Sequence, residues 1–154
     1  MSFIHESLYQ TKDFSSINFS EYITQLSKNL VHSYAYSDGE VKLKLDIQNV
    51  FLNLDLAIPS GLIINEILSN SLKYAFENKS EKDELHLQLL VKDNVILLMI
   101  GDNGIGLPKE IDFKNTDSLG LQIVTTLVDQ LSGSIEIDTN KKGTNYIVKF
   151  KQSK

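Results

Sequence analysis

The stretch INEILSNSLKYAFEN, residues 64–78, carries the most informative pattern in the chain. On a helix Glu66, Asn70 and Lys73 are spaced i, i+4 and i+7, so a carboxylate, a carboxamide and an ammonium lie along one face. The opposite face is apolar and carries Ile64, Leu68, Leu72 and Ala75. The pattern predicts an amphipathic helix whose polar stripe supplies an acid or base, a neutral oxygen ligand and a cation suited to phosphate.

A second stretch, IGDNGIGLP at residues 100–108, follows the run VILLMI at residues 95–100. Because that run is apolar on both faces, we expect a central strand, with Asp102 emerging at its end. A carboxylate there can accept the exocyclic N–H of adenine, and Gly104 and Gly106 let the backbone pass close to a ligand. The two stretches suggest a nucleotide site built without a P-loop.

Two shorter segments fit the same site. Ser118-Leu119-Gly120-Leu121 places a small polar residue and a glycine at a helix start, where free N–H groups and the helix dipole attract phosphate. Lys142-Gly143-Thr144 lies between two predicted strands. Taken singly, all four segments also have structural interpretations, as a solvated helix face, a turn, a capped helix and a hairpin.

The composition narrows the class of protein. The 154 residues are 42% hydrophobic and 23% charged, which suits one globular domain with a sizeable core. The formal net charge of −5 argues against a nucleic-acid surface. Cysteine is absent, and His5, His32 and His86 are too far apart in sequence to indicate a metal cluster. Since no long apolar run or leader is present, we expect a cytoplasmic domain without membrane contact.

Periodicity predicts an α+β two-layer sandwich, a mixed sheet covered on one face by helices. The expected helices span residues 2–10, 19–36, 59–76 and 119–131, and the expected strands span residues 41–47, 51–56, 85–92, 95–100, 135–138 and 146–150. Asn18 or Ser20 is the expected cap of the second helix, Pro59 opens the third, and Gly133 stops the last. Asp93-Asn94 is a favourable two-residue hairpin connection.

Together, the four segments follow one order along the chain: Asn-Glu-(three residues)-Asn-(two)-Lys-Tyr-Ala, Asp-Asn-Gly-Ile-Gly-Leu-Pro, Ser-Leu-Gly-Leu-Gln-Ile-Val and Lys-Gly-Thr. This series closely resembles the ATP-binding domain of sensor histidine kinases, a branch of the Bergerat-fold ATPases, over about residues 19–151. The resemblance implies a remnant of the dimerisation helix at residues 1–10, a linker at residues 11–18 and the ATP-binding domain at residues 19–154.

The resemblance also implies roles for individual residues. They comprise a Mg²⁺ ligand, a general base or orienting group, contacts to the base, glycines beneath the nucleotide, and contacts on the phosphate side. Asn70 would be the Mg²⁺ ligand and Glu66 the general base or orienting group. Asp102 would bind the adenine amino group, with Thr144 near the ring and Lys73 and Tyr74 as further nucleotide contacts. Gly104 and Gly106 would lie beneath the nucleotide, and Gly120 and Leu121 would contact its phosphate side. Residues 109–118 would form the ATP lid, with Ser118 where the family often has glycine.

The implied chemistry is transfer of the γ-phosphoryl group of ATP, with Mg²⁺, to a histidine of a dimerisation-helix domain and then to a response regulator receiver domain. The acceptor histidine of that family precedes this domain, and His5 matches a position downstream of it. We therefore expect an incomplete fragment that does not phosphorylate itself. Two alternatives stay open: a serine kinase of the anti-sigma type, and a Bergerat-fold nucleotide-binding interaction module without transferase activity.

Overall fold

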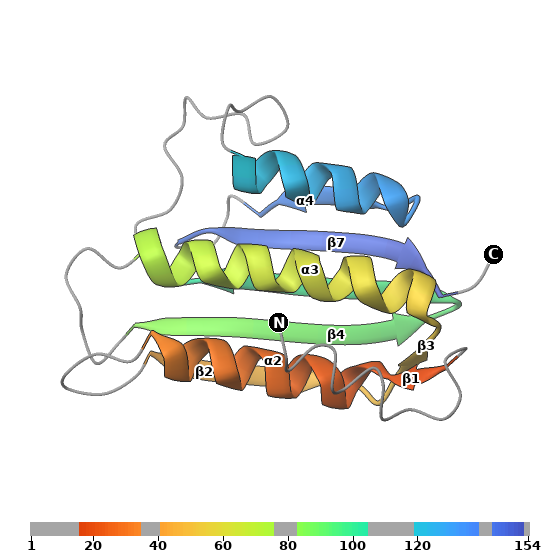
Figure 1. Ribbon diagram of the computed structural model, residues 1–154, viewed down its shortest axis with the longest axis horizontal. Helices are drawn as coiled ribbons and strands as arrows, with labels where there is room; N and C mark the ends of the chain where they lie inside the picture. Colours follow the sequence, from red (N-terminus) through yellow and green to blue (C-terminus); the bar gives the residue numbers. More distant parts are fainter. Residues whose placement is uncertain (1–15, 35–40, 76–82, 105–118, 139–142, 153–154) are drawn as a thin grey trace.

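The computed structural model describes residues 16–34, 41–75, 83–104, 119–138 and 143–152. Within these ranges five strands form one mixed sheet in the order β2-β4-β5-β7-β6, and helices α2, α3 and α4 lie together on one of its faces (Figure 1). The elements are β1 Ile17–Asn18, α2 Phe19–Ser33, β2 Lys42–Ile47, β3 Phe51–Leu52, α3 Leu54–Asn70, η1 Ser71–Ala75, β4 Glu84–Lys92, β5 Val95–Asp102, α4 Leu119–Gln130, β6 Ser134–Ile137 and β7 Asn145–Lys151. The predicted two-layer sandwich is confirmed.

Strand β5 is central in the sheet, as its apolar sequence predicts. It pairs antiparallel with β4 on one side and with β7 on the other, while β2 runs parallel to β4 at the sheet edge. The β4–β5 turn has positive φ at both Asp93 (52°) and Asn94 (67°), the conformation that a two-residue hairpin requires. This hairpin fixes the register that brings Asp102 to the end of β5, opposite Leu85.

Helix α2 begins where Asn18 caps it. The Asn18 side chain accepts the N–H of Glu21 at 3.1 Å, so Asn18, and not Ser20, is the cap. The two residues of β1, inside the expected linker, pair with β3 beside the main sheet. The expected helix at residues 2–10 lies outside the described residues.

Helix α3 begins earlier than the sequence analysis predicts. The strand expected at residues 51–56 is reduced to Phe51–Leu52, and the expected start at Pro59 is wrong, because α3 runs from Leu54 with Pro59 inside it. The reason is the cap: Asn53 Oδ1 accepts the N–H of Leu56 at 3.1 Å. Alternating leucines fitted a strand equally well, but a satisfied cap favours the helix despite the hydrogen bond that Pro59 cannot donate.

The end of α3 changes to a π-helix. Residues Ser71–Ala75 form η1, in which the wider turn replaces α-helical geometry directly after Asn70. Glu66 and Asn70, both half-buried, keep their one-turn spacing, but exposed Lys73 no longer continues their line. Of the three predicted polar residues, only Glu66 and Asn70 therefore lie on one face of the α-helix.

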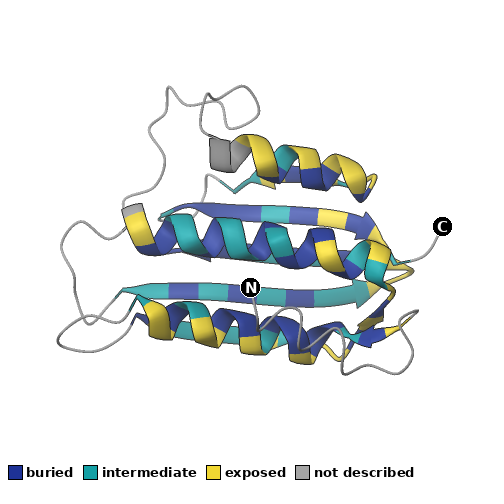
Figure 2. Cartoon of the chain, in the orientation of Figure 1, coloured by how far each residue is buried: buried dark blue, intermediate teal, exposed yellow. Residues whose placement is uncertain are grey.

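The core lies between the helix layer and the sheet (Figure 2). Helix α3 is the middle helix, and its buried side chains include Ile63, Ile64, Ile67 and Leu68. Gly61 lets α2 approach α3, because a Cβ there would lie 2.8 Å from the Tyr22 ring. No helix in the described ranges is long and apolar enough to cross a bilayer.

Helix α4 matches its predicted span and ends through two adjacent residues. Ser132, and not Gly133, adopts the left-handed conformation common at helix ends, with φ of 53°. Gly133 instead leaves room for β7, since a Cβ at that position would overlap the Lys149 carbonyl oxygen. Ser132 therefore ends the helix, and Gly133 allows β7 to pack closely.

The corrected start of α3 gives a test. Replacing Asn53 with Ala should lower the free energy of unfolding by about 1 kcal/mol, because the Leu56 N–H loses its cap. Asn53→Asp keeps an acceptor and should be nearly neutral. Chemical denaturation of both variants measures the difference; equal stability of Asn53→Ala and the wild type would contradict the cap.

Candidate functional site

Four elements converge at one edge of the sandwich. Strand β5 ends there with Asp102, β7 begins there with Asn145 paired to Gly101, and α3 passes into η1 beside them. The start of α4 lies at the same end of the molecule, at the left in Figure 1. Segments far apart in sequence thus surround the end of the central strand.

The Asp102 carboxylate is the centre of this edge and is 1% exposed. Its Oδ1 accepts the backbone N–H of Gly104 at 2.9 Å and that of Thr144 at 3.2 Å. Its Oδ2 accepts the Ser71 hydroxyl at 2.6 Å. Burying a carboxylate is costly unless donors surround it, and these three donors hold its plane in one orientation.

The backbone beside Asp102 is drawn close to β7. The Asp102 N–H donates to the Thr144 carbonyl at 2.9 Å. Gly143, with φ of +87°, allows this approach, because a Cβ there would overlap the Asp102 carbonyl oxygen. The segment Lys142-Gly143-Thr144 therefore has a structural reason for its glycine, and Thr144 is buried against Asp102.

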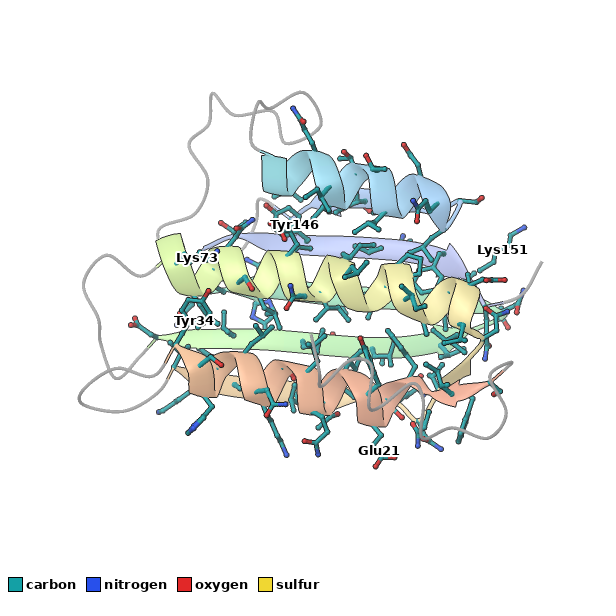
Figure 3. All side chains as sticks on the ribbon, in the orientation of Figure 1. Glu21, Tyr34, Lys73, Tyr146 and Lys151 are labelled. Carbon is teal, nitrogen blue, oxygen red and sulfur yellow. The ribbon has the colours of Figure 1, made fainter. Side chains whose placement is uncertain are left out.

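Tyr146 adds a buried hydroxyl to the same region, on the helix-facing side of β7 (Figure 3). Burial raises the pKa of Tyr146 to about 12, and the nearby Asp102 charge adds to the rise. Both effects favour the neutral phenol. The hydroxyl therefore stays protonated at any physiological pH.

The predicted site residues divide into three groups. The structure brings Asp102, Gly104 and Thr144 together through direct hydrogen bonds. Asn70 lies next to Ser71, with Glu66 one turn earlier on the same helix, and Lys73 is exposed on η1 at the same end (Figure 3). The remaining residues carry no described side chain: these are Tyr74 in η1 and Gly120 and Leu121 at the start of α4, while Gly106 and the expected lid at residues 109–118 lie outside the described ranges.

Ser71 was not among the site residues predicted from the sequence. Four residues after Ile67 and three after Leu68, Ser71 falls on the buried side of the helix, where a polar side chain needs a partner. A serine on the apolar side of the predicted helix was thus the signal that could have identified it. Its partner, 31 residues later, was not visible in a pattern of single segments.

Comparison with solved structures defines the class of fold. The histidine kinase domain of the blue-light-activated histidine kinase EL346 from Erythrobacter litoralis matches 98% of this chain and 70% of its own, with a TM-score of 0.86 at 20% identity. The mycobacterial sensor histidine kinase MprB matches 88% of this chain with a TM-score of 0.68 at 18% identity. The sandwich is thus the fold of histidine kinase catalytic domains.

The chain belongs to the family of histidine kinase-, DNA gyrase B- and HSP90-like ATPases, whose family model matches residues 57–154. Binding of ATP follows from this membership. A second family model, described as histidine kinase, matches residues 1–34. The resemblance drawn from the four sequence segments is confirmed.

Curated relatives agree with the family. Sensor histidine kinase PdtaS of Mycobacterium tuberculosis is 25% identical over 151 residues, covering 97% of this chain and 30% of that protein. Blue-light-activated histidine kinase 2 of Erythrobacter litoralis is 27% identical over 110 residues, covering 71% of this chain and 31% of that protein. The chain therefore spans about a third of the length of these relatives.

The buried phenol gives a pH test. An unfolded tyrosine ionises near pH 10, whereas folded Tyr146 ionises near pH 12, so folding stability should fall as the pH rises through this window. The wild type should lose about 2 to 3 kcal/mol more than Tyr146→Phe between these limits. Denaturant titrations of both proteins at pH 9 and above measure this difference, and parallel pH profiles would contradict it.

Proposed function

We propose that this chain is the ATP-binding catalytic part of a sensor histidine kinase. In this proposal it binds Mg-ATP at the Asp102 edge and transfers the γ-phosphoryl group to a histidine on a dimerisation-helix domain of the parent kinase. The observation that carries the proposal is the buried Asp102 carboxylate, which three donors hold at the end of the central strand.

The Asp102 carboxylate suits an adenine base. A buried carboxylate is an acceptor, so it selects a ligand group that donates, such as the exocyclic amine of adenine. Guanine carries a carbonyl oxygen at the same ring position, which a carboxylate repels. Thr144, buried beside Asp102, would face the same ring.

The phosphate side is assigned to the end of α3 and the start of α4. The Asn70 carboxamide would bind Mg²⁺, which prefers few protein oxygens together with phosphate oxygens and water. Glu66, one turn earlier, would orient or deprotonate the acceptor, and Lys73 and Tyr74 would contact the nucleotide. Gly104 and Gly106 would pass beneath it, with Gly120 and Leu121 at the phosphates, where helix N–H groups favour anions.

Catalysis in this assignment consists of placement and charge neutralisation. Phosphoryl transfer needs little covalent help from the protein, so a fixed base pocket and a metal-binding amide account for the rate. The phosphoryl group would pass from the histidine to a response regulator receiver domain. The domain would act in the cytoplasm, where ATP is supplied.

The histidine kinase match at residues 1–34 favours this function over the anti-sigma-type serine kinase and over a module that only binds nucleotide. Incubating the chain with γ-labelled ATP and a separate acceptor-helix domain should give acid-labile label on a histidine of that domain. Acid-stable label on serine would support the serine kinase, and nucleotide binding without transfer would support the interaction module.

The first experiment is a calorimetric titration with ATP, with and without Mg²⁺, beside GTP. We expect saturable binding that is selective for adenine. Absence of binding at millimolar ATP would contradict the proposed function.

The base contact is tested by Asp102→Asn. In the variant the side-chain oxygen must accept the Gly104 and Thr144 N–H groups, as Oδ1 of Asp102 does. The amide nitrogen then replaces Oδ2, where the adenine amine would donate. ATP affinity should fall at least about tenfold. Asp129→Asn makes the same charge change on the exposed side of α4 and serves as control. Equal ATP affinity in both variants would contradict the role of Asp102.

The metal contact is tested by Asn70→Ala. This variant should lose most of the gain in ATP affinity that Mg²⁺ provides, while metal-free ATP binds nearly as in the wild type. Asn65→Ala, a half-buried asparagine on another side of α3, is the matched control. Equal weakening with and without Mg²⁺ would exclude Asn70 as the ligand.

A further inference from the structure

Ser71 joins the helix layer to the end of the central strand. It is the first residue of η1 and is 6% exposed. Its hydroxyl donates to Asp102 Oδ2 at 2.6 Å. Because serine has a single O–H, this bond uses the only proton that the side chain can donate.

We propose that Ser71 is a positioning residue for base recognition, holding Asp102 Oδ2 so that its one remaining acceptor position faces the amino group of a 6-aminopurine nucleotide. The inference rests on the proposed function, since it takes Asp102 as the group that meets the base. It adds a residue and an atom to that site.

The acceptor positions of the carboxylate identify the oxygen. A carboxylate offers about four acceptor positions, two on each oxygen. Oδ1 already accepts from the Gly104 and Thr144 N–H groups, which fill its two positions. Among the described residues Ser71 is the one donor to Oδ2, so within this part of the chain the second acceptor position of that oxygen has no donor. The exocyclic amine therefore meets Oδ2, and the direction of the Ser71 bond determines where the open position points.

The same bond sets the polarity of the pocket. With its proton engaged, Ser71 presents only lone pairs, next to an oxygen that also accepts. Two neighbouring acceptors favour a donor such as the 6-amino group and disfavour the 6-carbonyl of inosine or guanine nucleotides. Ser71 thereby contributes to specificity through Asp102.

Removing the 6-amino group from the ligand tests this role. We would measure binding of ADP, and of purine riboside diphosphate, which lacks that group, to the wild type and to Ser71→Ala. ADP affinity should fall roughly fivefold or more in Ser71→Ala, while affinity for purine riboside diphosphate changes by less than about twofold. A merely structural role would weaken both ligands equally, and that result would overturn the proposal.

Two further variants separate the local effect from folding. Ser60→Ala removes another fully buried hydroxyl from the same helix, one that donates to the Leu56 carbonyl at 2.6 Å, and should leave both affinities unchanged. Ser71→Cys keeps the shape of the side chain, with a slightly larger atom, but offers only a weak donor, so it should behave as Ser71→Ala even where the alanine variant folds poorly.

The outcomes for the two proposals differ. Wild-type chain that does not bind ADP overturns the proposed function. Wild-type binding with unchanged ADP affinity in both Ser71 variants overturns the role of Ser71 alone, as does an equal loss in Ser60→Ala.

Discussion

The rest of the site depends on one constraint, which is that the buried Asp102 carboxylate must be surrounded by donors. At 1% exposure it has almost no water, and its hydrogen bonds come from a turn, from the residue directly before a neighbouring strand and from a helix. An anion buried without partners would cost several kcal/mol, comparable with the whole stability of a small domain. The positions of β5, β7 and η1 relative to one another therefore have little freedom.

Local features of the chain follow from this constraint. Gly143 has no side chain because the Asp102 carbonyl occupies its space, and this close approach is what brings the Thr144 N–H to the carboxylate. On the opposite side, the change from α-helix to π-helix begins at Ser71, the residue that bonds Asp102. Irregular helical turns often mark functional sites, and here the irregularity lies between the proposed metal ligand and the proposed base contact.

Much of this arrangement could be predicted from the sequence, since periodicity identified the sandwich, the central strand and the hairpin at residues 93–94. The prediction failed at Pro59, where alternating leucines at positions 52, 54 and 56 fitted a strand and the deciding cap, Asn53, acts through one local hydrogen bond. It also missed Ser71, because its partner lies in another segment. Periodic patterns report which face is buried, whereas single side-chain contacts depend on how separate segments meet in space. The roles of Glu66, Asn70 and Lys73 stay predictions from the family resemblance.

The parallel pairing of β2 with β4 has a consequence for folding. Two parallel neighbours need a long crossover, and here that crossover contains α3 and then η1, which begins at Ser71. Ser71 is separated from Asp102 by 31 residues and Thr144 from Asp102 by 42. Such non-local contacts carry a cost in chain-closure entropy, which must be overcome before they can stabilise the fold. The proposed base contact is therefore a product of the completed topology, and a ligand that binds there would shift the folding equilibrium of the entire domain.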